Sequence, residues 1–331
     1  MTRLFSGIQP SGELHIGNFL GAIHNWVELQ NTYEAIYCVV DLHALSGDFD
    51  PAILSERTLT MARHLLACGI DPDKSVLFVQ GHVPEHAELM WIFCSVTPIG
   101  ELERMTQFKD KSARQLSINT GLLIYPVLQA ADILLYKGEV VPVGEDQVQH
   151  LELTREIARK FNTRFGPTFP EPASRLSTAK RIVGLDGQAK MSKSLGNTIG
   201  IIESPESMWD KLRPAFTDPA RQRKSDPGEP TRCNIFTLHG YFTPAENQNE
   251  IASACRGATI GCFDCKKILH KNMSDRFEPI RQREAELQSK PGYVVDVLEA
   301  GASAARSIAR QTVGEVREKM GMLPCQTAGG D

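Results

Sequence analysis

The stretch Gly7–Asn18 reads G-I-Q-P-S-G-E-L-H-I-G-N, and the order of elements around it decides the fold. A short apolar run, Leu4-Phe5, precedes it, and apolar residues recur after it at the three-and-four spacing of one helix face. Those residues are Ile16, Phe19, Leu20, Ile23, Trp26 and Val27. The pattern predicts a strand, a glycine-rich turn and a helix. Because the free N–H groups and the dipole of a helix N-terminus attract phosphate, the stretch is a candidate phosphate site.

The residue types in this turn suit a ligand that approaches the backbone. Gly7, Gly12 and Gly17 have no Cβ, so a bulky planar group can come close. His15 and Asn18 add donors without a fixed positive charge, which suits a phosphoryl group whose charge changes during a reaction. By itself the stretch is equally compatible with an ordinary strand-to-helix turn whose histidine lies on the surface.

A second stretch, about 175 residues later, complements the first as a candidate phosphate site. The segment K-M-S-K-S at 190–194 follows G-L-D-G at 184–187 and is expected to form a mobile loop. Two ammonium groups three positions apart can close on a triphosphate and stabilise departing pyrophosphate. Alone, such a segment is usually solvated surface. Paired with His15-Ile-Gly-Asn18, it resembles the two signatures of the class I aminoacyl-tRNA synthetases.

Further blocks narrow the resemblance to the bacterial tryptophanyl-tRNA synthetases. They are G-I-Q-P-S-G at 7–12, D-L-H-A-L at 41–45, V-P-E-H-A-E at 83–88, G-E-L-E-R-M-T-Q-F-K-D-K-S at 100–112 and V-P-V-G-E-D-Q at 141–147. The resemblance implies a homodimeric tryptophan–tRNA ligase. Such an enzyme forms tryptophanyl-adenylate and pyrophosphate from tryptophan and Mg-ATP, and then transfers the tryptophanyl group to the 3′ end of tRNA(Trp).

Length and composition are compatible with this function. A chain of 331 residues predicts one large domain and a smaller one. The net charge of −4 argues against a basic coat, although residues 256–283 hold seven Lys/Arg against three Asp/Glu, an excess that a phosphate backbone would attract. No apolar run is long enough for a membrane span or a signal peptide, so a cytoplasmic protein is expected.

The alternation of strand-like and helical runs predicts an α/β fold. Strands are expected at 35–40, 75–79 and 140–143, and helices within 51–68, from residue 85 and over 147–161. This rhythm favours a Rossmann-like parallel sheet with ligands at the carboxyl ends of its strands. Prolines punctuate the chain after Asn197, and residues 246–323 read as helices. We expect a catalytic domain at 1–200 and a helical domain at 201–331, which the resemblance implies binds the anticodon and folds back on the catalytic part.

Asp132 is the most informative residue outside the two signatures. It lies in the apolar run 121–136, where a buried lone carboxylate is costly, so it either occupies a polar helix face or needs a donor. The resemblance implies that Asp132 accepts the indole N–H of tryptophan, a contact that rejects analogues without that group. Gln129 stands where related synthetases commonly have Met, and its amide is expected to bond Asp132 or to face a water.

The resemblance also assigns the remaining site residues. Catalytic roles fall to Gln9, His15, Asn18, Lys111, Lys190 and Lys193. ATP contacts fall to Gln9, Ser11, Gly17, Asn18, Gly144, Asp146, Val183, Lys190, Met191, Ser192 and Lys193. Tryptophan contacts fall to Phe5, Gly7, His43, Tyr125, Gln129, Asp132, Val141, Val143 and Gln147. From the residues alone, His43 is equally compatible with a structural role, and Lys111 with a solvated surface.

Four cysteines follow the spacing Cys-x21-Cys-x6-Cys-x2-Cys: Cys233, Cys255, Cys262 and Cys265. In a chain expected to be cytoplasmic, this spacing favours a metal over disulfides. All-thiolate ligation suits Zn²⁺ or a [4Fe–4S] cluster, and four free thiols remain an alternative. A subset of bacterial tryptophanyl-tRNA synthetases holds a [4Fe–4S] cluster on a similar pattern, which makes the cluster our expectation. Lys266, Lys267 and Lys271 suggest a surface nearby that meets the anticodon.

Three alternatives remain on sequence grounds. The related tyrosyl enzyme has both signatures but not the blocks at 100–112 and 141–147. A small-molecule nucleotidyltransferase would not need the helical region with its cysteines. A non-catalytic RNA-binding module with a zinc or iron–sulfur site would not need intact signature residues; those present are His15, Asn18, Lys190 and Lys193.

Overall fold

Five parallel strands form one sheet in the computed structural model, in the order β3-β2-β1-β4-β5. They are β1 (Arg3–Ile8), β2 (Glu34–Val39), β3 (Ser75–Val79), β4 (Val140–Val143) and β5 (Ala173–Leu176). The structure describes the whole chain except residues 48, 113–117, 177–181 and 324–331. The chain extends the sheet from β1 to β2 on one side and to β4 on the other, and such a reversal of strand order opens a crevice at the carboxyl ends.

Both faces of the sheet are covered, as expected for parallel strands made of continuous apolar runs. Along β2 the side chains alternate between two cores, with Tyr37 and Val39 in one and Ile36 and Cys38 in the other. The first core is covered by η1 (Phe19–Ile23), α2 (His24–Leu29) and α4 (Pro51–Ala67). The second is covered by α5 (Glu85–Cys94), α8 (Thr120–Leu135) and α9 (Val148–Phe165).

Short helical segments connect the longer elements. They are α1 (Ile16–Asn18), α3 (Asp41–Ala44), η2 (Gln80–His82), α6 (Ile99–Glu103), α7 (Thr106–Ser112), η3 (Glu145–Gln147), η4 (Lys193–Leu195) and η5 (Pro230–Arg232). Helix α9 extends four residues beyond the predicted end at Phe161, because Phe165 packs on Phe161 with ring centroids 4.9 Å apart. The helix stops at Gly166, whose φ of 96° lies in the region that glycine tolerates.

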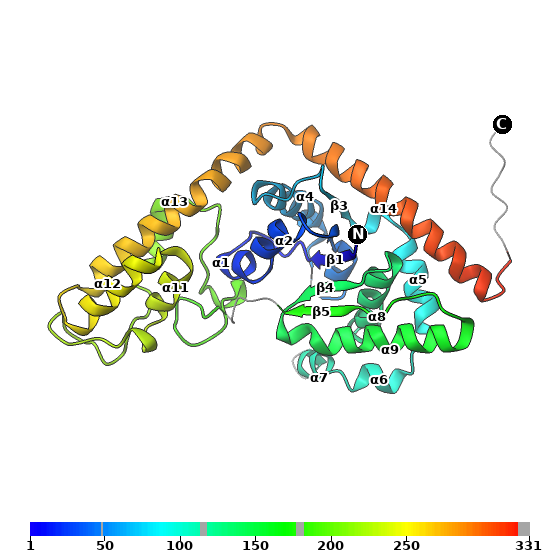
Figure 1. Ribbon diagram of the computed structural model, residues 1–331, viewed down its shortest axis with the longest axis horizontal. Helices are drawn as coiled ribbons and strands as arrows, with labels where there is room; N and C mark the ends of the chain where they lie inside the picture. Colours follow the sequence, from blue (N-terminus) through cyan, green and yellow to red (C-terminus); the bar gives the residue numbers. More distant parts are fainter. Residues whose placement is uncertain (48, 113–117, 177–181, 324–331) are drawn as a thin grey trace.

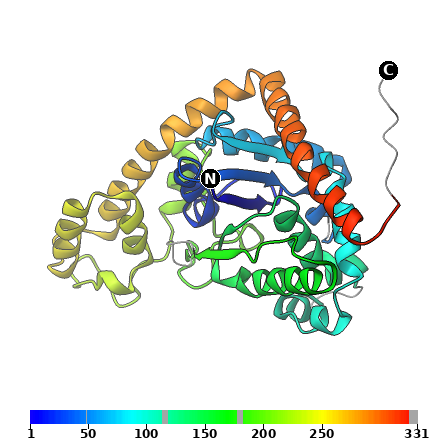
Figure 2. The same ribbon diagram turned by 45° about the vertical axis from the view of Figure 1, so that its right-hand side comes forward.

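The longer elements after β5 are all helices in the described part of the chain: α10 (Pro205–Leu212), α11 (Asn234–Phe242), α12 (Ala245–Arg256), α13 (Cys262–Gln288) and α14 (Pro291–Lys319). Helices α13 and α14 run end to end as an arch over the sheet-bearing part (Figure 1). Helices α11 and α12 pack beside the start of α13, away from the sheet (Figure 2). None of the described helices is long and apolar enough to cross a bilayer.

Helix α14 covers the exposed edge of the sheet along β3. Gly301 lies so close to this edge that an added Cβ would overlap the carbonyl oxygen of Leu77. Leu298 belongs to the first core and Ala305 to the second, so α14 closes the seam between the two. An uncovered edge strand can pair with a strand of another chain, and α14 blocks such pairing by covering β3.

Candidate active site

The first signature stretch forms the N-terminus of α1 at the carboxyl end of β1. The Nδ1 atom of His15 accepts a hydrogen bond from the backbone N–H of Gly17 at 3.1 Å. The Oδ1 atom of Asn18 accepts the backbone N–H of His15 at 3.3 Å, so the two side chains form a reciprocal capping box. Because Nδ1 accepts, the neutral imidazole has its proton on Nε2, which can donate to a ligand.

The surroundings keep His15 neutral. Burial, followed by the charges of Lys193 and Lys190, lowers the pKa of His15 to about 4. At neutral pH the ring is therefore an uncharged donor, as the sequence predicts. A single π-helical turn, η1, follows directly, and such turns often occur at functional sites.

The lysine loop, residues 190–194, meets the first stretch. The Nζ atom of Lys193 donates to the carbonyl oxygen of Ser11 at 2.9 Å, and an added Cβ on Gly17 would lie 3.5 Å from Cβ of Met191. Asn197 holds the loop from below: its Oδ1 accepts the N–H of Ser192 at 2.7 Å. The two signature stretches, far apart in the sequence, thus form one site.

Asp132 is buried and fully engaged in a polar cluster. Its exposed fraction is 2%, so the helix-surface alternative is wrong. His43 Nε2 donates to Oδ2 at 2.7 Å, while Gln80 Nε2 and His86 Nδ1 donate to Oδ1 at 2.6 and 2.7 Å. The Tyr136 hydroxyl contacts the other ring nitrogen of His86, Nε2, at 2.7 Å. Burial alone would raise the pKa of Asp132, but the contacts with His43 and His86 outweigh it and lower that pKa to about 2.

The cluster borders a cavity at the carboxyl end of β2. The cavity encloses about 830 Å³, part of it open to solvent, and its lining includes Gln9, Ser11 and His43. An ionised carboxylate offers about four acceptor positions, and three are used here. Contacts with described residues therefore leave room for one more donor on Oδ2, the oxygen that His43 contacts.

A third group lies at the carboxyl end of β4. The Tyr125 hydroxyl contacts His150 Nε2 at 2.9 Å and Gln107 at 3.2 Å, and burial raises the pKa of Tyr125 to about 12. Gln107 also donates to the carbonyl oxygen of Asp146 at 3.3 Å. The Gln147 amide donates to the Asp146 carboxylate at 3.3 Å.

The other predicted site residues occupy strand ends and neighbouring turns. Phe5 is buried in β1 and stacks on Tyr136 at 5.5 Å. Gly7 lies at the end of β1, and Val141 and Val143 are buried in β4, just before Gly144. Val183 pairs with Lys190 in an isolated bridge beneath the lysine loop. Lys111 falls within α7, and its side chain lies outside the described part of the structure.

Two details of the cluster were not predictable from the sequence patterns. The amide that reaches Asp132 belongs to Gln80; Gln129 lies one helical turn from Asp132 on α8 and is half-buried. Gln80 and His86 were missed as site residues. One signal pointed to Gln80: it directly follows β3, as Gln9 closely follows β1 and Gly144 follows β4.

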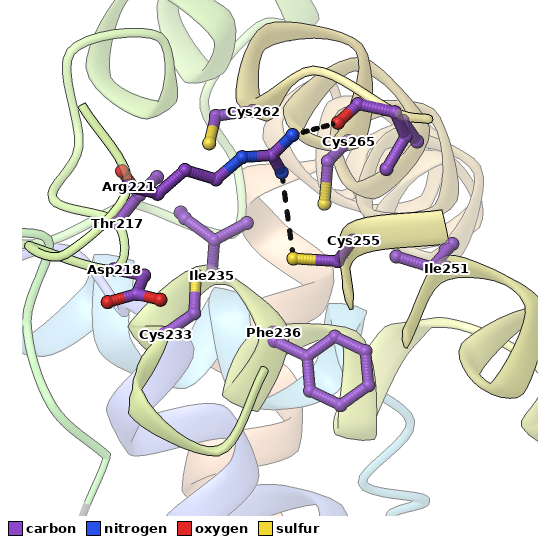
Figure 3. Close-up of a pocket in the computed structure, with 11 residues that line it drawn as sticks. Thr217, Asp218, Arg221, Cys233, Ile235, Phe236, Ile251, Cys255, Cys262 and Cys265 are labelled. Atoms are coloured by element: carbon purple, nitrogen blue, oxygen red, sulfur yellow. Dashed lines mark hydrogen bonds between the residues drawn. The ribbon is translucent and has the colours of Figure 1, made fainter. Parts of the chain in front are cut away.

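The four predicted metal-ligating cysteines line one pocket in the helical region (Figure 3). Burial and the other three cysteines raise the pKa of Cys265 to about 12, which reflects how near the sulfurs are. Arg221 also lines the pocket, with Nη1 3.6 Å from Cys255 Sγ. Within the described residues, no group of three or more His, Cys, Asp or Glu side chains is arranged to hold a metal ion.

One expectation about the neighbouring lysines is wrong. Lys266 does not belong to a surface, because its exposed fraction is only 6% and its Nζ donates to the carbonyl oxygens of Arg213 and Ala215 at 2.7 and 2.6 Å. The apolar surroundings of this helix face draw its stem inward, and two backbone acceptors replace water. Lys267 and Lys271 are exposed as expected.

Comparison with known proteins agrees with this geometry. The family model described as tRNA synthetases class I (W and Y) matches residues 1–278. A tryptophan–tRNA ligase of Deinococcus radiodurans is 56% identical over 98% of this chain and 99% of the relative, and one of Thermotoga maritima is 46% identical over 97% and 99%. The crystal structure of the Campylobacter jejuni tryptophanyl-tRNA synthetase, complexed with ADP and tryptophan, superposes with a TM-score of 0.89 at 38% identity, covering 97% of this chain and all of that one.

The chain therefore belongs to the class I tRNA synthetase family of the tryptophan and tyrosine enzymes. It is an aminoacyl-tRNA ligase, and the predicted α/β fold with a parallel sheet and a helical C-terminal region is confirmed.

Proposed function

We propose that the crevice at the carboxyl ends of β1, β2 and β4 is where this enzyme activates tryptophan. The enzyme is a tryptophan–tRNA ligase: it converts L-tryptophan and ATP into tryptophanyl-adenylate and pyrophosphate, and then transfers the tryptophanyl group to the 3′ end of tRNA(Trp). One observation carries the choice of site: the two signature stretches meet there, with Lys193 on the Ser11 carbonyl at 2.9 Å. Mg²⁺ accompanies the ATP phosphates.

The phosphates would lie between α1 and the lysine loop. An oxygen of the tryptophan carboxylate, near Gln9, bonds to the α-phosphorus while the bond to the pyrophosphate oxygen breaks. Lys190 and Lys193 stabilise the charge that grows on pyrophosphate, and Lys111 is assigned to the same phosphates. His15 Nε2 and the Asn18 amide follow the changing charge without adding a fixed one.

The adenosine would lie across the strand ends beside the phosphates. Gly144 and Asp146 are assigned to the ribose hydroxyls, because a carboxylate and an exposed backbone suit them. The remaining ATP contacts are assigned to Gln9, Ser11, Gly17, Asn18, Val183, Met191 and Ser192.

Asp132 would recognise the indole ring. Its one remaining acceptor position, on Oδ2, suits the indole N–H, and a carboxylate with a pKa near 2 offers no proton to a competing acceptor. Tyr125, Gln129 and Asp132 are spaced i, i+4 and i+7, so they share one face of α8. The other tryptophan contacts are assigned to Phe5, Gly7, His43, Val141, Val143 and Gln147.

An isosteric analogue tests this role of Asp132. In benzothienylalanine a sulfur replaces the indole N–H, so the ring keeps its shape and loses its donor. In ATP–pyrophosphate exchange the enzyme should prefer tryptophan over the analogue in kcat/KM by about 100-fold or more. Asp132→Asn should lose most of this preference, chiefly by losing tryptophan activity. An equal loss for both substrates would contradict the assignment.

The four-cysteine pocket, we further propose, holds a [4Fe–4S] cluster. The side chains of Cys233, Cys255, Cys262 and Cys265 line one pocket (Figure 3). All-thiolate ligation suits either a cluster or one tetrahedral zinc, and the resemblance of the cysteine spacing to that of the cluster-bearing enzymes favours the cluster. The Arg221 guanidinium offsets part of the thiolate charge. When bound, a cluster would cross-link the start of α11, the end of α12 and the start of α13.

Metal analysis of an anaerobic preparation tests the cluster. We expect a brown protein with about four irons per chain. Cys255→Ser should lose iron and colour, whereas Cys94→Ser, at a cysteine outside this pocket, should keep both. Zinc without iron, or no metal, would contradict the cluster.

The domain division and the tRNA contacts are also proposals. We place the catalytic domain at 1–200 and the helical domain at 201–331, with the exposed Lys267 and Lys271 of α13 on its anticodon-facing side. A homodimer would use the outer surface of α5 and α6, where Trp91 and Ile99 are 73% and 62% exposed. Large exposed apolar side chains of this kind favour an interface between subunits.

A further inference from the structure

A buried amide joins the four-cysteine pocket to the hairpin that precedes the lysine loop. Asn234 is the first residue of α11 and directly follows Cys233. Its Nδ2 atom donates to the carbonyl oxygen of Gly184 at 2.7 Å, and both groups are buried. Gly184 begins the turn 184–187, only six residues before Lys190. A residue beside one pocket cysteine therefore touches the base of the lysine loop.

A second connection begins beside another cysteine of the pocket. Lys266 directly follows Cys265, and its Nζ holds the carbonyl oxygen of Ala215 at 2.6 Å. The next residue, Phe216, donates its N–H to Leu185 at 2.8 Å, and its ring covers Gly187, where an added Cβ would overlap it. Both connections end on the same turn.

The turn is continuous with the lysine loop through backbone hydrogen bonds. Gly184 N–H donates to Ala189 at 2.8 Å, and Leu185 N–H donates to the carbonyl oxygen of Asn197 at 3.0 Å. Asn197 in turn fixes Ser192, between the two lysines, through its side chain. A displacement of the turn would therefore move Lys190 and Lys193 relative to His15.

We propose that Asn234 and Lys266 are positioning residues that couple the four-cysteine pocket to the lysine loop. This proposal rests on the assignment of Lys190 and Lys193 to the ATP phosphates. Neither Asn234 nor Lys266 is assigned a contact with substrate; each sets where the loop lies. A substitution at Cys255, a pocket cysteine that adjoins neither residue in the sequence, should then change the position of the lysine loop.

Kinetics of Asn234 variants test the positioning role. In ATP–pyrophosphate exchange, Asn234→Ala and Asn234→Asp should lower kcat by about 10- to 100-fold and leave KM for tryptophan unchanged, because the lysines act on the departing pyrophosphate. The aspartate variant keeps the shape and loses the donor. Asn162→Ala is the matched control, since its amide holds the carbonyl of Phe169 at 2.8 Å, far from the loop along the chain. Equal kcat losses in the control, or none in Asn234→Ala, would overturn the proposal.

Trypsin cleavage measures the coupling without activity. Peptides ending at Lys190 and Lys193 should appear faster from Asn234→Ala than from the unaltered enzyme. Cys255→Ser should give the same acceleration, and the double variant should add little to either single one. Unchanged cleavage in Cys255→Ser, or fully additive effects, would show that the pocket does not act through Asn234. Exchange activity of Lys193→Ala separates the two proposals: if it stays normal, the lysine assignment fails first.

Discussion

Asp132 accepts hydrogen bonds from His43, Gln80 and His86, which come from three different elements of the fold. A buried carboxylate keeps its charge only where donors replace the water it has lost. The three donors therefore hold the carboxylate ionised. The proposed contact with the indole N–H uses the acceptor capacity that these three donors leave on Oδ2.

Gln80 should matter for both stability and tryptophan binding. Gln80→Leu removes a hydrogen bond to a buried charge, so we expect the free energy of unfolding to fall by about 2 kcal/mol and KM for tryptophan to rise. Gln30→Leu is the control, because Gln30 is also a buried amide, bonded to the carbonyl of Gly69 at 2.9 Å and away from the site. It should lose stability with KM unchanged. Urea denaturation and exchange kinetics measure the two effects, and a raised KM in both variants would contradict a specific role.

His15 should titrate far below an ordinary histidine. We expect an NMR midpoint near pH 4, raised in Lys193→Ala because a nearby positive charge is removed. The folded-state pKa lies below the unfolded value of about 6.5, so unfolding takes up a proton between these values. The free energy of unfolding should therefore fall as pH falls through this window. A midpoint near 6.5 would contradict the lowering of the His15 pKa by burial and the two lysines. The signal is assigned with His15→Gln.

The glycine turn, the lysine loop and Asp132 stood out in the sequence as candidate site residues because their types and spacings are unusual. The partners of Asp132 were not. Gln80 is 52 residues from Asp132 in the sequence, and a single glutamine after a strand has no periodicity that predicts its contacts. Lys266 was predicted to be exposed, because it lies beside other lysines in the sequence. The two carbonyl oxygens that accept hydrogen bonds from its buried ammonium group are brought to it only by the fold.

At the scale of elements, the strands were the most predictable part. β3 and β4 have the predicted bounds, because each is a short apolar run whose flanking residues mark where the strand begins and ends. The helices were less certain at their ends. The extension of α9 depends on an aromatic contact between Phe161 and Phe165, which the polar spacing of that segment obscures.

Two glycines of α14 offer opposite outcomes for one substitution. Gly301→Ala should lower the free energy of unfolding by about 2 kcal/mol, because the new methyl group would collide with the β3 backbone at Leu77. Gly314→Ala should raise it by about 0.5–1 kcal/mol, since nothing lies within 4 Å of that site and alanine favours helix. Urea denaturation measures both. Equal effects would contradict the close packing of α14 on the sheet edge.

At the scale of the whole molecule, α13 links the cysteine pocket to the sheet-bearing part. It begins at Cys262, and further along Glu284 accepts a hydrogen bond from Arg63 of α4 at 2.7 Å. The helical character of this region was evident from the sequence. The path of α14 back to β3 was not, because an amphipathic pattern shows that a helix has a buried face but does not identify the surface that covers it.

The proposed dimer can be tested by mass. Light scattering should give about twice the chain mass of 36.6 kDa. Trp91→Glu should give a monomer, because a charge would replace the largest exposed apolar side chain of α5. Val295→Glu, at an exposed position on α14, should remain dimeric. A monomeric unaltered enzyme, or a dimeric Trp91→Glu, would contradict the assigned interface.

If the crevice activates tryptophan with ATP, the first step of the reaction needs no tRNA. ATP–pyrophosphate exchange with the purified enzyme measures this step, with tryptophan, tyrosine and phenylalanine each supplied in the presence and absence of tRNA. We expect exchange that requires tryptophan and does not require tRNA. Exchange driven best by tyrosine, or no exchange with any of the three amino acids, would contradict it.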